Sequence, residues 1–443
     1  MPMRVAFYTL GCKLNQAETE SLANRFDQAR FQIVSPGDEA DIYIANTCTV
    51  THIADRKSRH WLRLARRTNP KALIIATGCY AQRNPRELAQ LADFVVDNEE
   101  KQHLLELVTS LSLPIPSSVL ERISERHCER SEAISSPTNT VRTRSLIKIQ
   151  DGCHNHCTYC IVPKVRPHEY SLPASQIVDE IKQKVARGYK EVVLTGTKVG
   201  SYRDAVPSTS EGSSTDLRDL VQRILHNTNI ERLRLSSLQP SELSPEFLAL
   251  WQDERLCRHF HLALQSGSET VLQRMRRSYS LDQYQVTVNL IKDMIPEVAI
   301  TTDIMVGFPG ESDEEFEQSY SFCQQAGFAN IHVFPFSPRP TTAATSMPEQ
   351  TKDKVEQERN QRMLELSQSS RHNFCEQFLG QTMPVLWEKE TSPGSSIYSG
   401  LTSNYIRVFA HSEKSLSNKI TPVKLTEFRK QGVWGAVMDE NSG

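Results

Sequence analysis

Apolar strand-like runs alternate with helix-like segments along the first hundred residues, and this alternation most restricts the possible fold. The strand-like runs are Arg4–Leu10, Asp41–Asn46, Ala72–Thr77 and Asp93–Asp97, and helical stretches occupy Glu18–Phe26 and Ala54–Arg67. Such alternation is typical of a parallel sheet flanked by helices. Ligands of open α/β sheets bind beyond the carboxyl ends of the strands. We therefore expect an α/β fold with its binding edge at those ends.

A cysteine stands two residues after each of the first three predicted strands, at Cys12, Cys48 and Cys79. The parallel sheet would bring these thiols to one edge. A single free cysteine is usually just a small buried residue. Three at one offset favour thiolate ligation of an iron-sulfur cluster. The remaining cysteines share no such offset and are interpreted as structural, namely Cys128, Cys257, Cys323 and Cys375.

A second group of cysteines is much denser, with Cys153, Cys157 and Cys160 separated by three and two residues. Thiolates are the usual ligands of iron-sulfur clusters, and three of them leave one iron of a cubane free for another ligand. The alternative is a zinc site, which needs a fourth ligand that His154 or His156 could supply. The spacing favours the cluster.

The same motif, with the aromatic Tyr159 before Cys160, resembles the cluster motif of radical S-adenosylmethionine enzymes. The resemblance implies a 4Fe-4S cluster on Cys153, Cys157 and Cys160, whose free iron chelates S-adenosylmethionine. One electron would then cleave the cofactor to a 5′-deoxyadenosyl radical. These three cysteines are accordingly the candidate catalytic and metal-binding residues.

Six further strand candidates with helical segments between them follow from residue 146 onward. They are Leu146–Ile149, Glu191–Leu194, Arg232–Leu235, Phe260–Leu264, Ala299–Met305 and Asn330–Phe336. Six βα units predict a partial (β/α)6 barrel, shorter than the closed eightfold form. Polar or glycine-bearing tails after these strands are often simple turns. The superfamily resemblance nevertheless implies that Thr195, Gly196 and Gln265 contact S-adenosylmethionine.

Near the C-terminus the pattern changes from a polar helical stretch, Asp353–Phe378, to short alternating strands. These are Met383–Glu388, Tyr405–Phe409, Ile420–Lys424 and Gly432–Val437, a spacing that predicts a small β-barrel. Tyr405 and Arg407 should share one exposed face that could stack bases and neutralise phosphate, although a plain solvated face is equally compatible. The segment Gly400–Val408 resembles the TRAM domain, an RNA-binding barrel, which favours an RNA substrate.

Composition excludes several classes of protein. The chain of 443 residues is long enough for two or three domains, and its formal charge of -2 gives no overall nucleic-acid signature. RNA would therefore need local patches, such as the basic helix Arg56–Arg67. Ten cysteines are too few for a disulfide scaffold and indicate a reducing compartment. Without a secretion-signal core or membrane-length apolar run, we expect a soluble cytoplasmic enzyme with no membrane partner.

Three segments around the early cysteines carry a more specific resemblance. Tyr8–Glu20, Asn46–Val50 and Thr77–Gln82 resemble the N-terminal domain of methylthiotransferases, radical S-adenosylmethionine enzymes with two 4Fe-4S clusters. The match covers nearly the whole chain apart from one middle segment, and Gly11–Gln16 is closest to the MtaB branch. One departure is that Arg166–Tyr170 replaces the basic Arg-Gly run common in the family, which puts local RNA contacts in doubt.

The resemblance implies methylthiolation of C2 of N6-threonylcarbamoyladenosine at position 37 of tRNA. The cluster on Cys12, Cys48 and Cys79 would carry the sulfur, which a second S-adenosylmethionine methylates. The implied partners are tRNA, S-adenosylmethionine, a sulfur donor and an electron donor such as flavodoxin or ferredoxin. The alternatives are a methylthiotransferase acting on isopentenyladenosine tRNA or ribosomal protein S12, and a non-catalytic, zinc-stabilised RNA-binding protein.

The predicted organisation has four parts. Residues 1–110 form the cluster-binding N-terminal domain, and 111–143 form a linker or insertion that is rich in Ser, Pro, Glu and Arg. Residues 144–377 form the radical S-adenosylmethionine core, and 378–443 form the TRAM-like domain. The predicted fold class is thus α/β, with a small β-barrel at the C-terminus.

Overall fold

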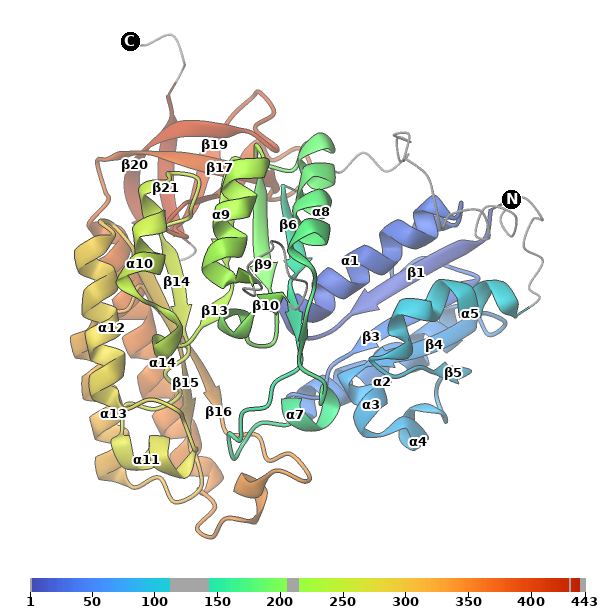
Figure 1. The fold of residues 1–443 in the computed structure, drawn as a ribbon, viewed down its shortest axis with the longest axis horizontal. Coiled ribbons are helices and arrows are strands. Elements are labelled where there is room, and N and C mark those ends of the chain that lie inside the picture. The colour runs from blue at the N-terminus through green and yellow to red at the C-terminus, as the bar shows by residue number, and fades with distance from the viewer. Residues whose placement is uncertain (1, 112–142, 205–214, 430–431, 439–443) are drawn as a thin grey trace.

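The computed structural model describes residues 2–111, 143–204, 215–429 and 432–438. In Figure 1 an N-terminal α/β unit (blue) lies beside a central unit of strands and helices, and a small barrel (red) lies at one end of the central unit. The predicted linker falls almost wholly outside the described residues, so the domain boundaries stay predictions. None of the described helices combines the length and apolar character that a membrane crossing requires.

The N-terminal unit is a five-stranded parallel sheet in the order β2-β1-β3-β4-β5. Its strands are β1 (Arg4–Thr9), β2 (Gln32–Val34), β3 (Ile42–Thr47), β4 (Leu73–Gly78) and β5 (Phe94–Val95). Its helices are α1 (Lys13–Gln28), α2 (His52–Thr68), α3 (Cys79–Arg83), α4 (Pro85–Leu88), η1 (Glu100–His103) and α5 (Leu104–Ser110). The alternation read from the sequence is therefore confirmed as a parallel α/β sheet.

Helices cover both faces of this sheet because apolar side chains recur at helical spacing along them. On α2, Trp61, Leu62 and Ala65 are buried against one face of the sheet. On α1, Leu22 and Phe26 are buried against the other. The Thr51 side chain caps α2 by accepting a hydrogen bond from the Ala54 N–H. The sheet is thus fixed from both sides, with its carboxyl edge left for the loops.

Six longer parallel strands and the two-residue β13 form the central unit, in two neighbouring sheets ordered β12-β9-β6 and β13-β14-β15-β16. The six are β6 (Arg144–Lys148), β9 (Glu191–Thr195), β12 (Arg232–Leu235), β14 (His259–Leu262), β15 (Ala299–Val306) and β16 (Asn330–Pro335). The predicted partial (β/α)6 barrel is confirmed, with strand ends within two residues of the expected ones. Figure 1 shows its helices gathered on the outer side of these strands.

The longer helices of the central unit are α8 (Ala174–Ala186), α9 (Leu217–Asn227), α12 (Leu281–Met294), α13 (Asp313–Ala326) and α14 (Asp353–Glu376). Shorter helical elements are α7 (Val162–Val165), η2 (Val199–Ser201), η3 (Pro240–Glu242), α10 (Pro245–Leu248), η4 (Ala249–Gln252), α11 (Glu269–Arg274) and η5 (Ala343–Ser346). Short strands are β7 (Gln150–Asp151), β8 (Tyr170–Ser171), β10 (Arg203–Asp204), β11 (Thr215–Asp216) and β13 (Ser237–Leu238).

The C-terminal unit is a closed barrel in the order β17-β18-β19-β21-β20, as the strand spacing predicts. Its strands are β17 (Thr382–Glu390), β18 (Ile397–Thr402), β19 (Arg407–His411), β20 (Ile420–Arg429) and β21 (Gly432–Val437). The sequence pattern did not reveal β18. Closure leaves no unpaired sheet edge, and Val385, Trp387 and Val408 fill the interior.

The prediction that Tyr405 lies on an exposed strand face is wrong. Tyr405 precedes β19 and has a left-handed φ of 70°. Its ring stacks on His259 of the central unit with centroids 4.5 Å apart, and the Arg234 guanidinium lies 4.8 Å from its centroid. Tyr405 therefore packs between the two units, and the turn conformation breaks the strand alternation that placed it beside Arg407 at the surface.

Candidate active site

The N-terminal cysteines lie at the carboxyl edge of the parallel sheet, because β1, β3 and β4 are neighbours in it. Cys12 precedes α1, Cys48 follows β3, and Cys79 is the first residue of α3. Gly11, with φ +109°, lets the first loop approach closely, since a Cβ there would stand 3.0 Å from Cys48 Sγ. Burial raises the pKa of the Cys48 thiol to about 12, and the neighbouring Cys79 and Cys12 add to that shift.

The second group of cysteines occupies the loop between β7 and α7. The Asn155 N–H donates to Cys153 Sγ over 3.4 Å, and Arg277 Nη1 donates to Cys157 Sγ over 3.3 Å. Burial raises the pKa of the Cys160 thiol to about 12, with the nearby Cys157 and Cys153 adding to it. Ligation by thiolate therefore requires a metal group strong enough to displace these protons.

The donor sets fit iron-sulfur clusters better than single zinc ions. Each thiolate of a cubane binds its own iron, so the sulfurs need not converge on one point. Among the residues that the structure describes, no three His, Cys, Asp or Glu side chains are arranged to hold one metal ion. His154, a candidate fourth zinc ligand, is exposed, and its ring lies against the Pro167 carbonyl at 3.1 Å and Glu169 at 3.5 Å.

The two cysteine loops meet where the N-terminal and central units touch. Cys79 packs against Ile161 and Val165, which directly follow the Cys160 end of the second loop. The Asn98 side chain adds a polar contact by donating to the Val165 carbonyl over 2.9 Å. The two groups of thiols therefore lie on neighbouring surfaces rather than at opposite ends of the molecule.

Arg166 ties both loops together through a buried ion network. Its Nη1 lies 2.9 Å from Glu18 Oε1 on α1 and 2.7 Å from both Asp151 oxygens. Its Nη2 donates to Asn15 Oδ1 over 3.0 Å and to Glu18 Oε2 over 2.9 Å. The guanidinium side chain is only 3% exposed. Glu18 and Asn15 follow Cys12 on α1 and Asp151 precedes Cys153, so one residue fixes both segments.

Two lysines complete this network. Lys101 lies 2.6 Å from Glu18, and Lys148 lies 3.1 Å from Glu18 and 2.5 Å from Asp151. Three cations thus face two carboxylates. Burial raises the pKa of the Cys12 thiol, and the nearby Arg166 opposes that shift, while Cys79 helps to raise the pKa of Arg166. Positive charge favours thiolate over thiol. In the sequence Arg166 stands out only as part of a departure from the basic run common in the family, and no local pattern there predicts this role.

The predicted S-adenosylmethionine contacts lie at the carboxyl ends of barrel strands. Thr195 ends β9, and its carbonyl already accepts from the Ile149 N–H. A Cβ on Gly196 would stand 2.9 Å from the Gln150 carbonyl, so the backbone passes close to the segment leading to the cysteine loop. Gln265 has φ 74°, and its buried Oε1 has no hydrogen-bond partner among the described residues. An orphaned buried acceptor is suited to a ligand.

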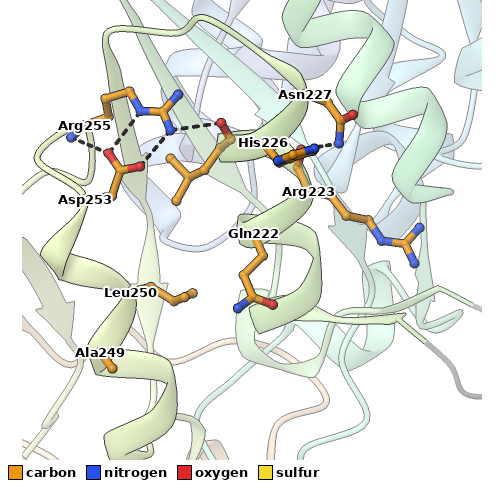
Figure 2. Close-up of a pocket in the computed structure, with 9 residues that line it drawn as sticks. Gln222, Arg223, His226, Asn227, Ala249, Leu250, Asp253 and Arg255 are labelled. Carbon is orange, nitrogen blue, oxygen red and sulfur yellow. Dashed lines mark hydrogen bonds and ion pairs between the residues drawn. The ribbon is translucent and has the colours of Figure 1, made fainter.

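A hollow of about 690 Å³ on the outer helices is separate from these loops (Figure 2). It lies between α9 and the η4 region, lined by residues such as Gln222, His226 and Leu250. Of the two arginines that line it, Arg255 is engaged by Asp253 and by the carbonyls of Leu225 and Thr228. None of the six candidate cysteines lines it.

Comparisons with known proteins identify the class of the fold. The model of the radical SAM superfamily matches residues 147–323, and the model described as uncharacterized protein family UPF0004 matches residues 4–97. A solved radical S-adenosylmethionine methyltransferase, TsrM of Kitasatospora setae, shares the fold with a TM-score of 0.53 and 15% identity over 88% of this chain and 79% of that one. The central barrel with its cysteine loop is thus a radical S-adenosylmethionine fold.

Full-length relatives identify the family. The threonylcarbamoyladenosine tRNA methylthiotransferase MtaB of Bacillus subtilis is 35% identical over 95% of this chain and 93% of its own. The protein of that name from Aquifex aeolicus is 37% identical over 92% and 96%. A tRNA-2-methylthio-N(6)-dimethylallyladenosine synthase of Syntrophotalea carbinolica is 30% identical over 95% and 97%. The chain belongs to the methylthiotransferase family of radical S-adenosylmethionine enzymes, which implies S-adenosylmethionine and 4Fe-4S clusters as its cofactors.

Proposed function

We propose that this protein methylthiolates C2 of N6-threonylcarbamoyladenosine at position 37 of tRNA. The observation that supports this proposal most strongly is the similarity, over nearly the full length, to relatives that are named for that activity. The neighbouring thiol groups of the N-terminal and central units support it, because one group would serve S-adenosylmethionine and the other would serve sulfur transfer. C2 of an adenine is neither acidic nor electrophilic enough for acid-base chemistry alone, so a cofactor must supply the reactivity.

Cys153, Cys157 and Cys160 are the proposed ligands of the cluster that binds S-adenosylmethionine, and Cys12, Cys48 and Cys79 are those of the second cluster. When bound, the first supplies the electron that cleaves S-adenosylmethionine and the second supplies a site for the transferred sulfur. Thr195, Gly196 and Gln265 are the proposed cofactor contacts. The Gln265 Oε1 atom, which has no partner among the described residues, would accept a hydrogen bond from the cofactor.

The protein side chains around the loops would act by orientation and charge. Arg277 donates to Cys157 Sγ, and hydrogen bonds to cluster sulfurs tune reduction potential. The same guanidinium donates to the Tyr279 hydroxyl over 3.0 Å, which fixes its direction. Arg166 would hold the two cysteine loops in register through Glu18 and Asp151. Side chains that hold the ligands of a metal in place commonly set the geometry of the site.

The exposed face of α2 is the proposed phosphate-binding surface. Arg56, Lys57, Arg63 and Arg67 are exposed at helical spacing along it, and none has a carboxylate partner in the described part of the chain. The C-terminal barrel offers a second proposed RNA-binding surface, which does not include Tyr405. There the Arg429 guanidinium lies 4.5 Å from the Trp434 ring centroid, and Phe409 stacks on that ring. Basic and aromatic groups together suit single-stranded RNA.

The test is anaerobic reconstitution followed by nucleoside mass spectrometry of tRNA incubated with the protein. Two cubanes predict about eight irons per chain. Cys157→Ala should abolish S-adenosylmethionine cleavage but keep about half of the iron, whereas Cys48→Ala should retain cleavage without forming the methylthio nucleoside. Cys375→Ala, at a buried cysteine of the α14 end, is the matched control. A preparation without iron, or a product on dimethylallyladenosine instead, would contradict the proposal.

The remaining partners are part of the same proposal. Cleavage of S-adenosylmethionine consumes one electron per event, so a low-potential donor such as flavodoxin or ferredoxin is required, together with a sulfur donor to renew the transferred atom. We place the reaction in the cytoplasm, where cysteine thiols remain reduced. Omission of the reductant from the reconstituted reaction should stop product formation while leaving tRNA binding intact.

A further inference from the structure

The connection from β16 to α14, residues 336–352, contacts the cysteine loop of the central unit. Figure 1 shows this connection (orange) beyond the end of β16. The Ala344 N–H donates to the carbonyl of Thr158, which lies inside the cysteine loop, over 2.9 Å. Tyr159 of the same loop packs against the apolar cluster that contains Phe336 and Ala344. The connection therefore supports the part of the loop that carries its last two cysteines.

From the same connection, Arg339 reaches the N-terminal unit. Its Nη2 lies 2.5 Å from Asp55 Oδ2 on α2 and 3.1 Å from Thr49 Oγ1. Thr49 directly follows Cys48, and its hydroxyl donates to Asp55 Oδ1 over 2.6 Å. The Arg339 side chain is only 3% exposed. A buried ion pair, which salt screens little, thus joins the central unit to the segment beside an N-terminal cysteine.

Hydrogen bonds hold the connection in a compact turn between its two points of contact. The Arg339 carbonyl accepts from the Thr342 N–H over 3.1 Å, from the Thr342 hydroxyl over 2.8 Å and from the Thr345 hydroxyl over 2.7 Å. These bonds fix Arg339 relative to Ala344, which contacts Thr158. A continuous series of short contacts therefore runs from the N-terminal cysteines to the cysteine loop of the central unit.

This contact complements the network of Arg166. Arg166 attaches the segment after Cys12 to the segment before Cys153. Arg339 attaches the segment after Cys48 to the later part of the same loop. A single ion pair between two units leaves rotation about itself open, whereas two pairs at different cysteines fix both distance and angle. Functional groups that act together need a geometry that is held to within about 0.5 Å.

We propose that Arg339 is a positioning residue for transfer of the methylthio group, an inference that rests on the proposed function. It acts through Thr49 and Asp55, which hold the Cys48 side of the N-terminal cysteines at a set distance from the cysteine loop of the central unit. The substrate must reach both groups of cysteines in one binding event. A displacement of about 1 Å can reduce turnover about 100-fold. Loss of the contact therefore uncouples S-adenosylmethionine cleavage from product formation.

The test counts the molecules of 5′-deoxyadenosine formed per molecule of methylthio nucleoside by the anaerobically reconstituted full-length protein. Arg339→Met should raise this ratio by about tenfold or more, because the two groups of cysteines lose their set separation. S-adenosylmethionine cleavage should stay within about twofold of wild type, and iron should stay at about eight per chain. Arg339→Lys keeps a charged donor for Asp55 and should recover part of the coupling.

Arg83→Met is the matched comparison. The Arg83 Nη2 lies 2.9 Å from the same Asp55 oxygen, but Arg83 belongs to α3 of the N-terminal unit. Its loss removes an equal charge from Asp55 without breaking the link between the units, so the ratio should stay near that of wild type. Arg362→Met, at an exposed arginine paired with Glu317 within the central unit, is a second control and should also keep the ratio.

Amide hydrogen exchange of the reconstituted proteins without tRNA gives a readout that does not depend on activity. In Arg339→Met, the amides of residues 48–55 and 156–160 should exchange about tenfold faster, because both segments lose a shared support. The amides of α1, which the Arg166 network holds, should keep their wild-type rates. Unchanged exchange in both segments would show that the contact does not hold them.

An unchanged ratio of 5′-deoxyadenosine to product in Arg339→Met overturns the inference. So does an equal rise in Arg83→Met, because the charge beside Asp55 would then matter rather than the link between the units. Loss of about half of the iron from Arg339→Met also overturns it, since that identifies a purely structural role. Arg339→Gln replaces the methionine variant if that variant does not fold. Failure of wild type to form the methylthio nucleoside would instead show that the proposed function is wrong.

Discussion

At the scale of single residues, Arg166 shows how one buried charge can organise a site between two units. Its guanidinium contacts Glu18 from the N-terminal unit and Asp151 from the central unit. Burying these charges costs free energy, and only close pairing with several hydrogen bonds offsets that cost. Removing one member leaves its partners buried and uncompensated. The network is therefore sensitive to any single substitution, and Glu18 forms ion pairs with all three of its cations, whereas Asp151 pairs with two.

We expect Glu18→Gln to lower the free energy of unfolding at pH 7 by about 3–5 kcal/mol, the usual cost of breaking a buried pair. Burial alone would raise the pKa of Glu18, but Lys101, Arg166 and Lys148 together hold it well below its ordinary value of 4.5. The stabilisation is thus fully present above that ordinary value and is lost as pH falls towards the folded-state pKa. Urea unfolding of the cluster-free proteins over an acid pH series measures the difference in the free energy of unfolding between the variant and wild type.

The difference in the free energy of unfolding between wild type and Glu18→Gln should stay constant from neutral pH down to about pH 4.5 and become smaller at lower pH. Glu254→Gln, at an exposed glutamate without an ion-pair partner in the described chain, should differ little from wild type at any pH. If the stability difference between Glu18→Gln and wild type is unchanged throughout the acid series, the charge of Glu18 is not the cause of the destabilisation.

At the scale of elements, the turns between strands and helices decide where the thiols lie. The junction of β4 and α3 is a tight one. Gly78 has φ +95°, and a Cβ there would stand 2.4 Å from the Thr47 carbonyl. Only glycine adopts this conformation without strain and without displacing β3. The next residue is Cys79, so the position of its thiol depends directly on this turn.

Gly78→Ala should therefore destabilise the fold by about 1–3 kcal/mol and displace Cys79 from the N-terminal cysteine group. We expect iron per chain to fall from about eight towards about four after reconstitution, with S-adenosylmethionine cleavage retained. Iron analysis and thermal unfolding measure the two effects. Gly37→Ala is the matched control, since nothing stands within 4 Å of its added Cβ. Full iron loading of the Gly78→Ala protein would contradict this dependence.

At the scale of the whole molecule, the C-terminal barrel docks firmly on the central unit. Arg232 of β12 donates to the Leu401 and Pro384 carbonyls, both over 2.8 Å. Tyr405 stacks on His259, and Asn404 donates to the Glu297 carbonyl over 3.1 Å. These contacts fix the direction in which the barrel presents its outer surface. An RNA bound there would therefore be held at a set position relative to the cysteine loops.

Arg232→Met should weaken this docking by about 2–4 kcal/mol, because two buried carbonyls lose a charged donor. We expect calorimetry to show a separate, earlier transition for the C-terminal barrel, and limited proteolysis to release it more readily. Arg218→Met, at an exposed arginine of α9, should leave the unfolding profile within about 0.5 kcal/mol of wild type. Unaltered calorimetric and proteolytic behaviour of Arg232→Met would show that the docking rests on other contacts.

The sequence by itself determined the class of fold and the cysteine pattern. Alternating strand and helix periodicity is a local property, because it follows from which faces of each element must be buried. It correctly predicted the parallel N-terminal sheet, the six barrel strands and the closed C-terminal barrel. The position of Cys12, Cys48 and Cys79 two residues after their predicted strands is likewise visible in the local sequence. Their meeting at one edge then followed from parallel strand order alone.

Tertiary structure alone decided which distant residues touch. Arg166 lies far from Glu18 in sequence, and no local pattern marks the pair as partners. The predicted position of Tyr405 was wrong because a left-handed turn interrupts the strand alternation there and directs the ring towards His259. Burial and charge pairing depend on the assembled neighbours of a residue, and chain order does not encode them locally.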